Sequence, residues 1–140
     1  MVEIQIAYKG DLRCVATHVQ SGTTLVTDAP LDNMGRGESF SPTDLVATAL
    51  GACMMTIMGI AARKHEIDLS GTTVRVLKEM VSAPERRVGT LTVEFTIPAA
   101  ATPQQRIALE RAAMACPVHR SISAEVQMPV TFHWTSLHRQ

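Results

Sequence analysis

Hydrophobic and polar positions alternate along the first part of the chain, from Val2 to Tyr8, and this period of two is typical of a β-strand. Turn residues follow at Lys9-Gly10-Asp11 and again at Ser21-Gly22. The pattern therefore predicts a β-meander, with strands over residues 2–8, 12–19 and 23–27. Residues 28–40 are rich in glycine, proline and aspartate, which predicts a loop around Arg36.

The pattern then changes to that of a long helix with a marked start. Ser41 suits the N-cap, Pro42 the first helical position, and Asp44 completes a capping box. The residues that follow are almost all apolar as far as Ala62, and basic residues come next. We expect a helix over residues 42–65 that is buried in the centre of the domain and offers part of its apolar surface to a second subunit.

The uncharged run from Leu45 to Ala62 also approaches the length of about 18 residues at which a membrane-spanning helix has to be considered. Polar residues and glycines interrupt the run, and no tryptophan or tyrosine flanks it as an interfacial anchor. A core helix is the favoured interpretation, and no membrane partner is expected.

The second half of the chain predicts two long strands, a helix and a last strand. The strands are expected over residues 72–81 and 87–97, and the last over 126–134. Thr102 and Gln105 repeat the capping box, and Pro117 disfavours helix at Cys116, so the second helix is expected to end there. A short helical turn can follow over residues 117–122. The element order predicts an α+β fold in a single domain, residues 1–140.

Composition excludes several classes of function. The 140 residues include 13 Lys plus Arg and 13 Asp plus Glu, so no overall field favours nucleic acid. The N-terminal residues lack the pattern of a secretory signal. Three cysteines are few for a disulfide scaffold, and an odd number cannot all be paired. We therefore expect a cytoplasmic protein without a nucleic-acid partner.

Two of the three cysteines are candidates for chemistry. Cys53 lies halfway along the apolar helix, where cysteine often serves as a small hydrophobic residue. Apolar surroundings disfavour a thiolate, so a reactive Cys53 requires a nearby cation. Arg36 is the first candidate and Arg13 the second, because both lie in segments that have to fold back over the helix.

Cys116 precedes Pro117 and is expected to cap a short helix, where free N–H groups favour a thiolate. His119 and Arg120 follow within one turn. Local electrostatics thus predict Cys116 to be the more acidic thiol, while Cys14, in a strand, is interpreted as structural. A zinc site formed by Cys53, Cys116 and His119 is an alternative, but the sequence has only one such ligand spacing.

The run from Ser41 to Cys53 (SPTDLVATALGAC) resembles the central-helix motif of the OsmC/Ohr family, the osmotically induced and organic hydroperoxide resistance proteins. The run from Cys116 to Ile122 (CPVHRSI) is similar to the second cysteine motif of that family. The resemblance covers nearly the whole chain, including the order of strands and helices.

This resemblance implies a thiol peroxidase that works as an intertwined homodimer. Cys53 would be the peroxidatic cysteine and Cys116 the resolving one, and the sulfenic acid on Cys53 would close to a disulfide. The implied partners are an organic hydroperoxide and a small or protein dithiol, with no metal or other cofactor.

One position departs from the family pattern. The peroxidase branches carry a glutamate that holds a catalytic arginine, and Thr43 stands there in this chain. Asp44 is adjacent but faces about 100° away along a helix. An alternative function is therefore a dimeric protein that binds a small hydrophobic ligand or senses redox state, and Met54, Met55 and Met58 are compatible with a ligand pocket.

Overall fold

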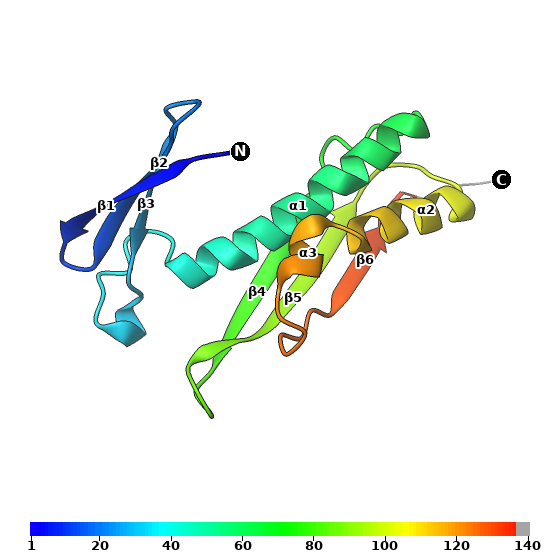
Figure 1. Ribbon diagram of the computed structural model, residues 1–140. Coiled ribbons are helices and arrows are strands. Elements are labelled where there is room, and N and C mark those ends of the chain that lie inside the picture. Colours follow the sequence, from blue (N-terminus) through cyan, green and yellow to red (C-terminus); the bar gives the residue numbers. More distant parts are fainter. Residues whose placement is uncertain (137–140) are drawn as a thin grey trace. The chain divides into compact units, whose positions relative to one another are not determined.

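The computed structural model describes residues 1–136, and the chain forms two compact units (Figure 1). The N-terminal unit covers Met1–Val46, and the C-terminal unit begins at Ala47. The fold class is α+β, as predicted. The expectation of one domain over residues 1–140 stays a prediction, and its last four residues lie outside the described part of the chain.

The N-terminal unit is the predicted β-meander. Its strands are β1 (Ile4–Gly10), β2 (Arg13–His18) and β3 (Thr24–Asp28), and they pair antiparallel in that order. A 3₁₀ turn, η1 (Leu31–Asn33), follows in the predicted loop.

The long helix α1 (Pro42–Lys64) begins with the predicted capping box. The N–H of Ser41 donates to the Asp44 carboxylate at 2.8 Å, and the N–H of Asp44 donates to the Ser41 hydroxyl at 3.1 Å. These two reciprocal bonds satisfy backbone groups that a helix start leaves without partners. The N-terminal end of α1 is therefore fixed by its own sequence.

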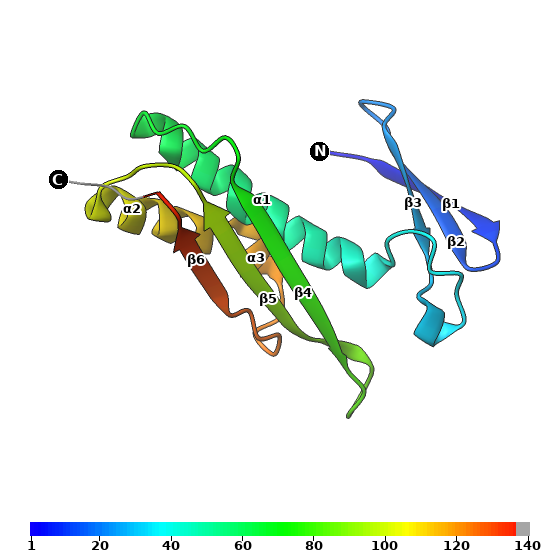
Figure 2. The same cartoon turned by 180° about the vertical axis from the view of Figure 1, so that it is seen from behind.

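The C-terminal unit is a three-stranded sheet with helices on one face (Figures 1 and 2). The strands lie in the order β4 (Thr73–Val81), β5 (Arg87–Ile97) and β6 (Val130–Trp134). The remaining helices are α2 (Pro103–Met114) and α3 (Pro117–Ser121), both close to their predicted positions.

The last strand differs from its prediction. It begins at Val130 rather than at residue 126, and before it only Gln127 forms an isolated bridge, to Thr90. It pairs with β5 in parallel, and the sequence pattern made no prediction about the direction of this pairing. The reason is topological: α2 and α3 carry the chain back across the sheet between β5 and β6, and a crossover of this kind produces parallel neighbours.

The core of the C-terminal unit lies between α1, α2 and the sheet. Gly51 lets α1 approach β4 closely, since a Cβ at this position would lie 2.8 Å from a methyl carbon of Val76. The residues of this core with no exposed surface are Leu50, Met54, Met58, Leu91, Val93, Phe95, Ile97, Leu109, Ala113 and Cys116.

Only one face of α1 is buried within the chain. The opposite face exposes apolar side chains, among them Val46 and Ile60. By length and composition alone α1 could cross a membrane. In the structure, however, the buried residues Leu50, Met54 and Met58 place it over the sheet as a core helix.

Candidate functional site

Cys53 lies in the middle of α1, at the border between the buried and the exposed face of the helix. Its side chain is half-buried and packs against the core. The neighbouring Ala52 and Thr56 are exposed, and the Thr56 hydroxyl donates to the Ala52 carbonyl at 2.8 Å. Cys53 can therefore be approached from the exposed face while its position is held by the packing of the helix.

Cys116 forms the N-cap of α3, as predicted, and is fully buried. Its sulfur accepts a hydrogen bond from the backbone N–H of His119 at 3.2 Å. Pro117 occupies the first position of α3, where a backbone N–H would have no partner within the helix. The sequence around Cys116 thus fixes the direction of its thiol.

The structure brings Cys53 and Cys116 together. The Cys53 side chain lies within hydrogen-bonding reach of the Cys116 thiol, and both are free thiols. Burial raises the pKa of Cys116, and the charge of a thiolate on Cys53 raises it further. The N–H groups of Val118 and His119 act in the opposite direction but do not outweigh burial.

The raised pKa of Cys116 runs against the expectation that the start of the short helix makes this thiol acidic. The helix N-terminus does favour a thiolate there, as the sequence indicates, but desolvation costs the charged form more. In the resting pair Cys116 is therefore held as a neutral thiol.

Cys14 belongs to the N-terminal unit. It occupies the middle of the meander, opposite Tyr8 on β1 and Thr27 on β3, and it is a free thiol.

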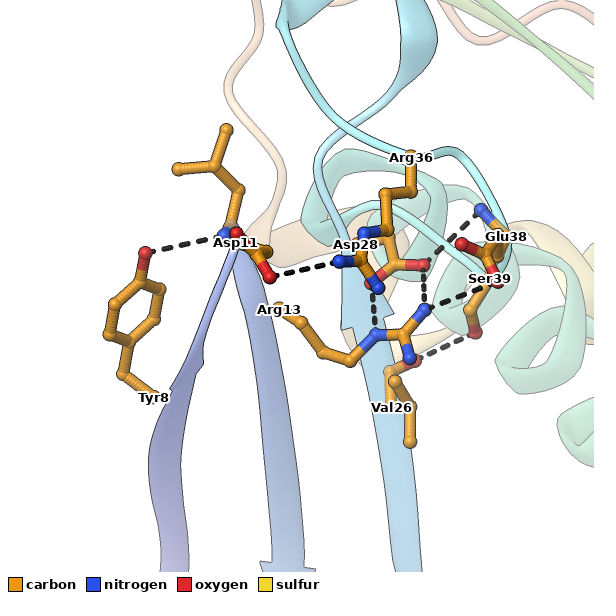
Figure 3. Close-up of polar contacts among 9 residues, drawn as sticks. Tyr8, Asp11, Arg13, Val26, Asp28, Arg36, Glu38 and Ser39 are labelled. Carbon is orange, nitrogen blue, oxygen red and sulfur yellow. Dashed lines mark hydrogen bonds and ion pairs between the residues drawn. The ribbon is translucent and has the colours of Figure 1, made fainter.

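Arg13 is held by a buried carboxylate in the N-terminal unit (Figure 3). It lies opposite Asp28 in the pairing of β2 with β3, and its Nε and Nη2 donate to the two Asp28 oxygens at 2.6 and 2.8 Å. Glu38 lies 3.7 Å from the same guanidinium. The guanidinium lowers the pKa of Asp28, and Asp28 in turn raises the pKa of Arg13.

Arg36 has a different environment. It donates to the Asp11 carboxylate at 2.8 Å, and this pair is largely exposed, with 52% of the Arg36 side chain accessible. Only glycine fits at the preceding position, Gly35, because the Cβ of any other residue would overlap the Ala29 carbonyl. The loop is therefore fixed at Gly35 while the Arg36 side chain reaches into solvent.

Two further candidates have structural roles in the described contacts. Asp44 forms the capping box of α1, and His119 provides the N–H that binds Cys116. Asp28 is a further residue of this contact that the sequence pattern does not reveal, because nothing local distinguishes a buried partner of Arg13 from any aspartate at the end of a strand.

Neither alternative interpretation gains support from side-chain positions. Within residues 1–136, no group of three His, Cys, Asp or Glu side chains is arranged to hold a metal ion. Met54 and Met58 have no exposed surface and belong to the core, so they do not line a ligand pocket in this chain.

The fold and the site together define a class of protein. It is an α+β chain in which a helix of 23 residues carries one cysteine, and the N-cap of a later helix places a second cysteine beside it. Residues 35–131 match the family model described as OsmC-like protein. This chain belongs to the OsmC-like protein family. No protein with a curated description has a significantly similar sequence.

Solved structures agree with this assignment. A protein of Psychrobacter arcticus 273-4, described as a candidate osmotic stress induced and detoxification response protein, is 44% identical. The match covers 95% of this chain and 96% of that one, with a TM-score of 0.90.

Two more distant structures share the fold. The OsmC-like protein of Mycoplasma pneumoniae has a TM-score of 0.79 at 14% identity, with 94% and 95% of the two chains covered. The organic hydroperoxide resistance protein OsmC of Legionella pneumophila has a TM-score of 0.75 at 16% identity, with 95% and 96% covered.

Proposed function

We propose that this protein is a thiol peroxidase that reduces organic hydroperoxides through Cys53 and Cys116. The observation that supports the proposal most directly is the proximity of the two thiols, one half-buried on α1 and one buried at the N-cap of α3. Membership of the OsmC-like family and the names of structural relatives such as the Legionella pneumophila protein agree with it.

In the first step the Cys53 thiolate attacks the terminal oxygen of the hydroperoxide. A sulfur–oxygen bond forms, the oxygen–oxygen bond breaks, and the alkoxide leaves as an alcohol after it takes up a proton. Cys53 is oxidised to a sulfenic acid and the hydroperoxide is reduced. Burial raises the pKa of Cys116, so this cysteine stays a neutral thiol and is suited to the second step.

In the second step the Cys116 sulfur attacks the Cys53 sulfur. A disulfide forms, and the hydroxyl of the sulfenic acid leaves as water with the Cys116 proton. A cytoplasmic dithiol, small or protein-bound, then reduces the disulfide by exchange and restores both thiols. This cycle uses no cofactor.

The thiolate of Cys53 also needs a cation, and Arg36 is our first candidate. Its hydrogen-bonded partner is the exposed Asp11, and it also lowers the pKa of Asp28 through its charge, whereas Arg13 bonds Asp28 directly. We further propose that the active assembly is a homodimer.

The test is a stoichiometric titration of the reduced protein with cumene hydroperoxide and, separately, with hydrogen peroxide. One equivalent of cumene hydroperoxide should remove two free thiols per chain, and peptide mass spectrometry should find a Cys53–Cys116 bridge with Cys14 still reduced. Full retention of free thiols after several equivalents would contradict the proposal and favour the ligand-binding alternative.

A further inference from the structure

The C-terminal unit contains a cavity of about 430 Å³ that the cysteine chemistry does not use. Its volume lies in the range of small-molecule sites, about 300–1,000 Å³. The cavity is lined by α2, α3 and β6, and its lining residues are Ile107, Glu110, Arg111, Met114, Ala115, Arg120 and Phe132.

One face of α2 supplies most of this lining. Its four residues have the spacing i, i+3, i+4 and i+7, which places them in one stripe along a helix. The stripe differs from the one that enters the core, which contains Leu109 and Ala113. Ile107 and Met114 remain 53% and 40% exposed, so α2 presents a second apolar surface that the chain itself leaves uncovered.

Phe132 provides a rigid wall of the cavity. It lies opposite Phe95 in the pairing of β5 with β6, and the two rings stack with their centroids 4.8 Å apart. Because Phe95 is fully buried in the core, Phe132 is supported from behind and keeps its position. An apolar ligand would therefore meet a preformed surface rather than one that has to be ordered on binding.

Charge at the cavity favours an anion. The lining includes two arginines, Arg111 and Arg120, and one carboxylate, Glu110, so its formal charge is positive by one. Among residues 1–136, neither arginine forms a salt bridge or a side-chain hydrogen bond. Arginine is well suited to bind carboxylates, because its planar fork can donate two parallel hydrogen bonds.

We propose that this cavity binds an amphipathic carboxylate, with its alkyl chain on Ile107, Met114 and Phe132 and its carboxylate on Arg111 and Arg120. The site is separate from the thiol pair, since neither Cys53 nor Cys116 lines it. The proposal therefore goes beyond the peroxidase function and does not depend on it.

Isothermal titration calorimetry with decanoate, below its micellar concentration, tests the proposal. Decanoate should bind at one site per chain and more weakly as salt is raised, while decyltrimethylammonium, with the same tail and the opposite charge, should not bind. The double variant Arg111→Met/Arg120→Met should bind decanoate at least about tenfold more weakly, because charge-assisted hydrogen bonds are lost. Ile107→Asp adds a carboxylate to the apolar wall and should weaken decanoate binding to a similar extent.

A matched control removes two other arginines, Arg63→Met/Arg75→Met, and should bind decanoate like the wild type. Cys53→Ser should also bind normally, so a failure of this proposal is distinguishable from a failure of the peroxidase proposal. Equal binding of both amphiphiles, unchanged affinity in the double variant, or no binding to the folded wild type would overturn it. A fall in the oligomer mass of Ile107→Asp, together with no decanoate binding to the wild type, would also overturn the proposal. This face of α2 would then be a contact between copies of the chain.

Discussion

The backbone N–H of His119 lies 3.2 Å from the Cys116 sulfur and donates a hydrogen bond to it, and yet the pKa of Cys116 is raised. Burial and the neighbouring Cys53 outweigh the N–H groups at the start of α3. A buried thiol with a raised pKa stays neutral and unreactive beside a more exposed sulfur, and it is suited to react once that sulfur has been oxidised.

The first prediction separates the roles of the two cysteines. Cys53→Ser should consume no peroxide, because the attacking sulfur is absent. Cys116→Ser should react once and leave a sulfenic acid on Cys53, which over-oxidises with excess peroxide. A sulfenic-acid trap followed by mass spectrometry measures both, with Cys14→Ser as the matched control that should behave like the wild type. The reverse pattern would assign the attack to Cys116.

The second prediction concerns the pKa of Cys116. Since a thiolate on Cys53 raises this pKa, Cys53→Ser should lower it towards the ordinary cysteine value while burial keeps it above that value. NMR titration of protein labelled with ¹³C at the cysteine Cβ follows the change directly. An identical titration curve in the wild type and the variant would show that the two thiols do not interact.

The third prediction tests the proposed activating arginine. Arg36→Ala should slow peroxide consumption about tenfold or more, since each 1.4 kcal/mol in the barrier is about a factor of ten. Arg75→Ala is the control, because it removes another exposed arginine that lies 3.8 Å from a carboxylate, that of Glu94. If Arg13→Ala alone slows the reaction, the activating role belongs to Arg13; unchanged rates in both variants would exclude both residues.

The fourth prediction is an acid-dependent loss of stability in the β-meander. Asp28 has a lowered pKa in the folded state, so its contribution is present above the unfolded value of about 3.9 and is lost as the pH falls through the folded value. Amide hydrogen exchange of residues 13–28, corrected for intrinsic rates, should show less protection at pH 3 than at pH 6. In Asp28→Asn protection should be lower throughout and less dependent on pH; an unchanged pH dependence would mean that other groups cause it.

The fifth prediction is that the protein is a homodimer and that the exposed face of α1 contributes to the contact. Ile60 is 51% exposed within the chain, so Ile60→Asp should cost an isolated chain little but should weaken a dimer strongly. Light scattering at micromolar concentration should give a dimer mass for the wild type and a lower mass for the variant. Gln104→Asp, on the exposed start of α2, is the control for the added charge, and a folded wild-type monomer would contradict the prediction.

The sequence by itself determined the local structure, because the signals that produce it lie close together in the chain. The capping residues Ser41 and Asp44 mark the start of α1, Thr102 and Gln105 mark that of α2, and Pro117 places Cys116 at the N-cap of α3. The two cysteine motifs were sufficient to identify the family, which the comparisons confirm.

Only the tertiary structure decided what depends on residues distant in sequence. The proximity of Cys53 to Cys116, the burial that raises the pKa of Cys116, and the pairing of Arg13 with Asp28 all arise from packing between separate elements. The parallel pairing of β6 with β5 was not predicted for the same reason, since strand alternation defines faces but not neighbours. Desolvation in particular cannot be judged from local sequence, because it depends on everything that surrounds a group in the folded chain.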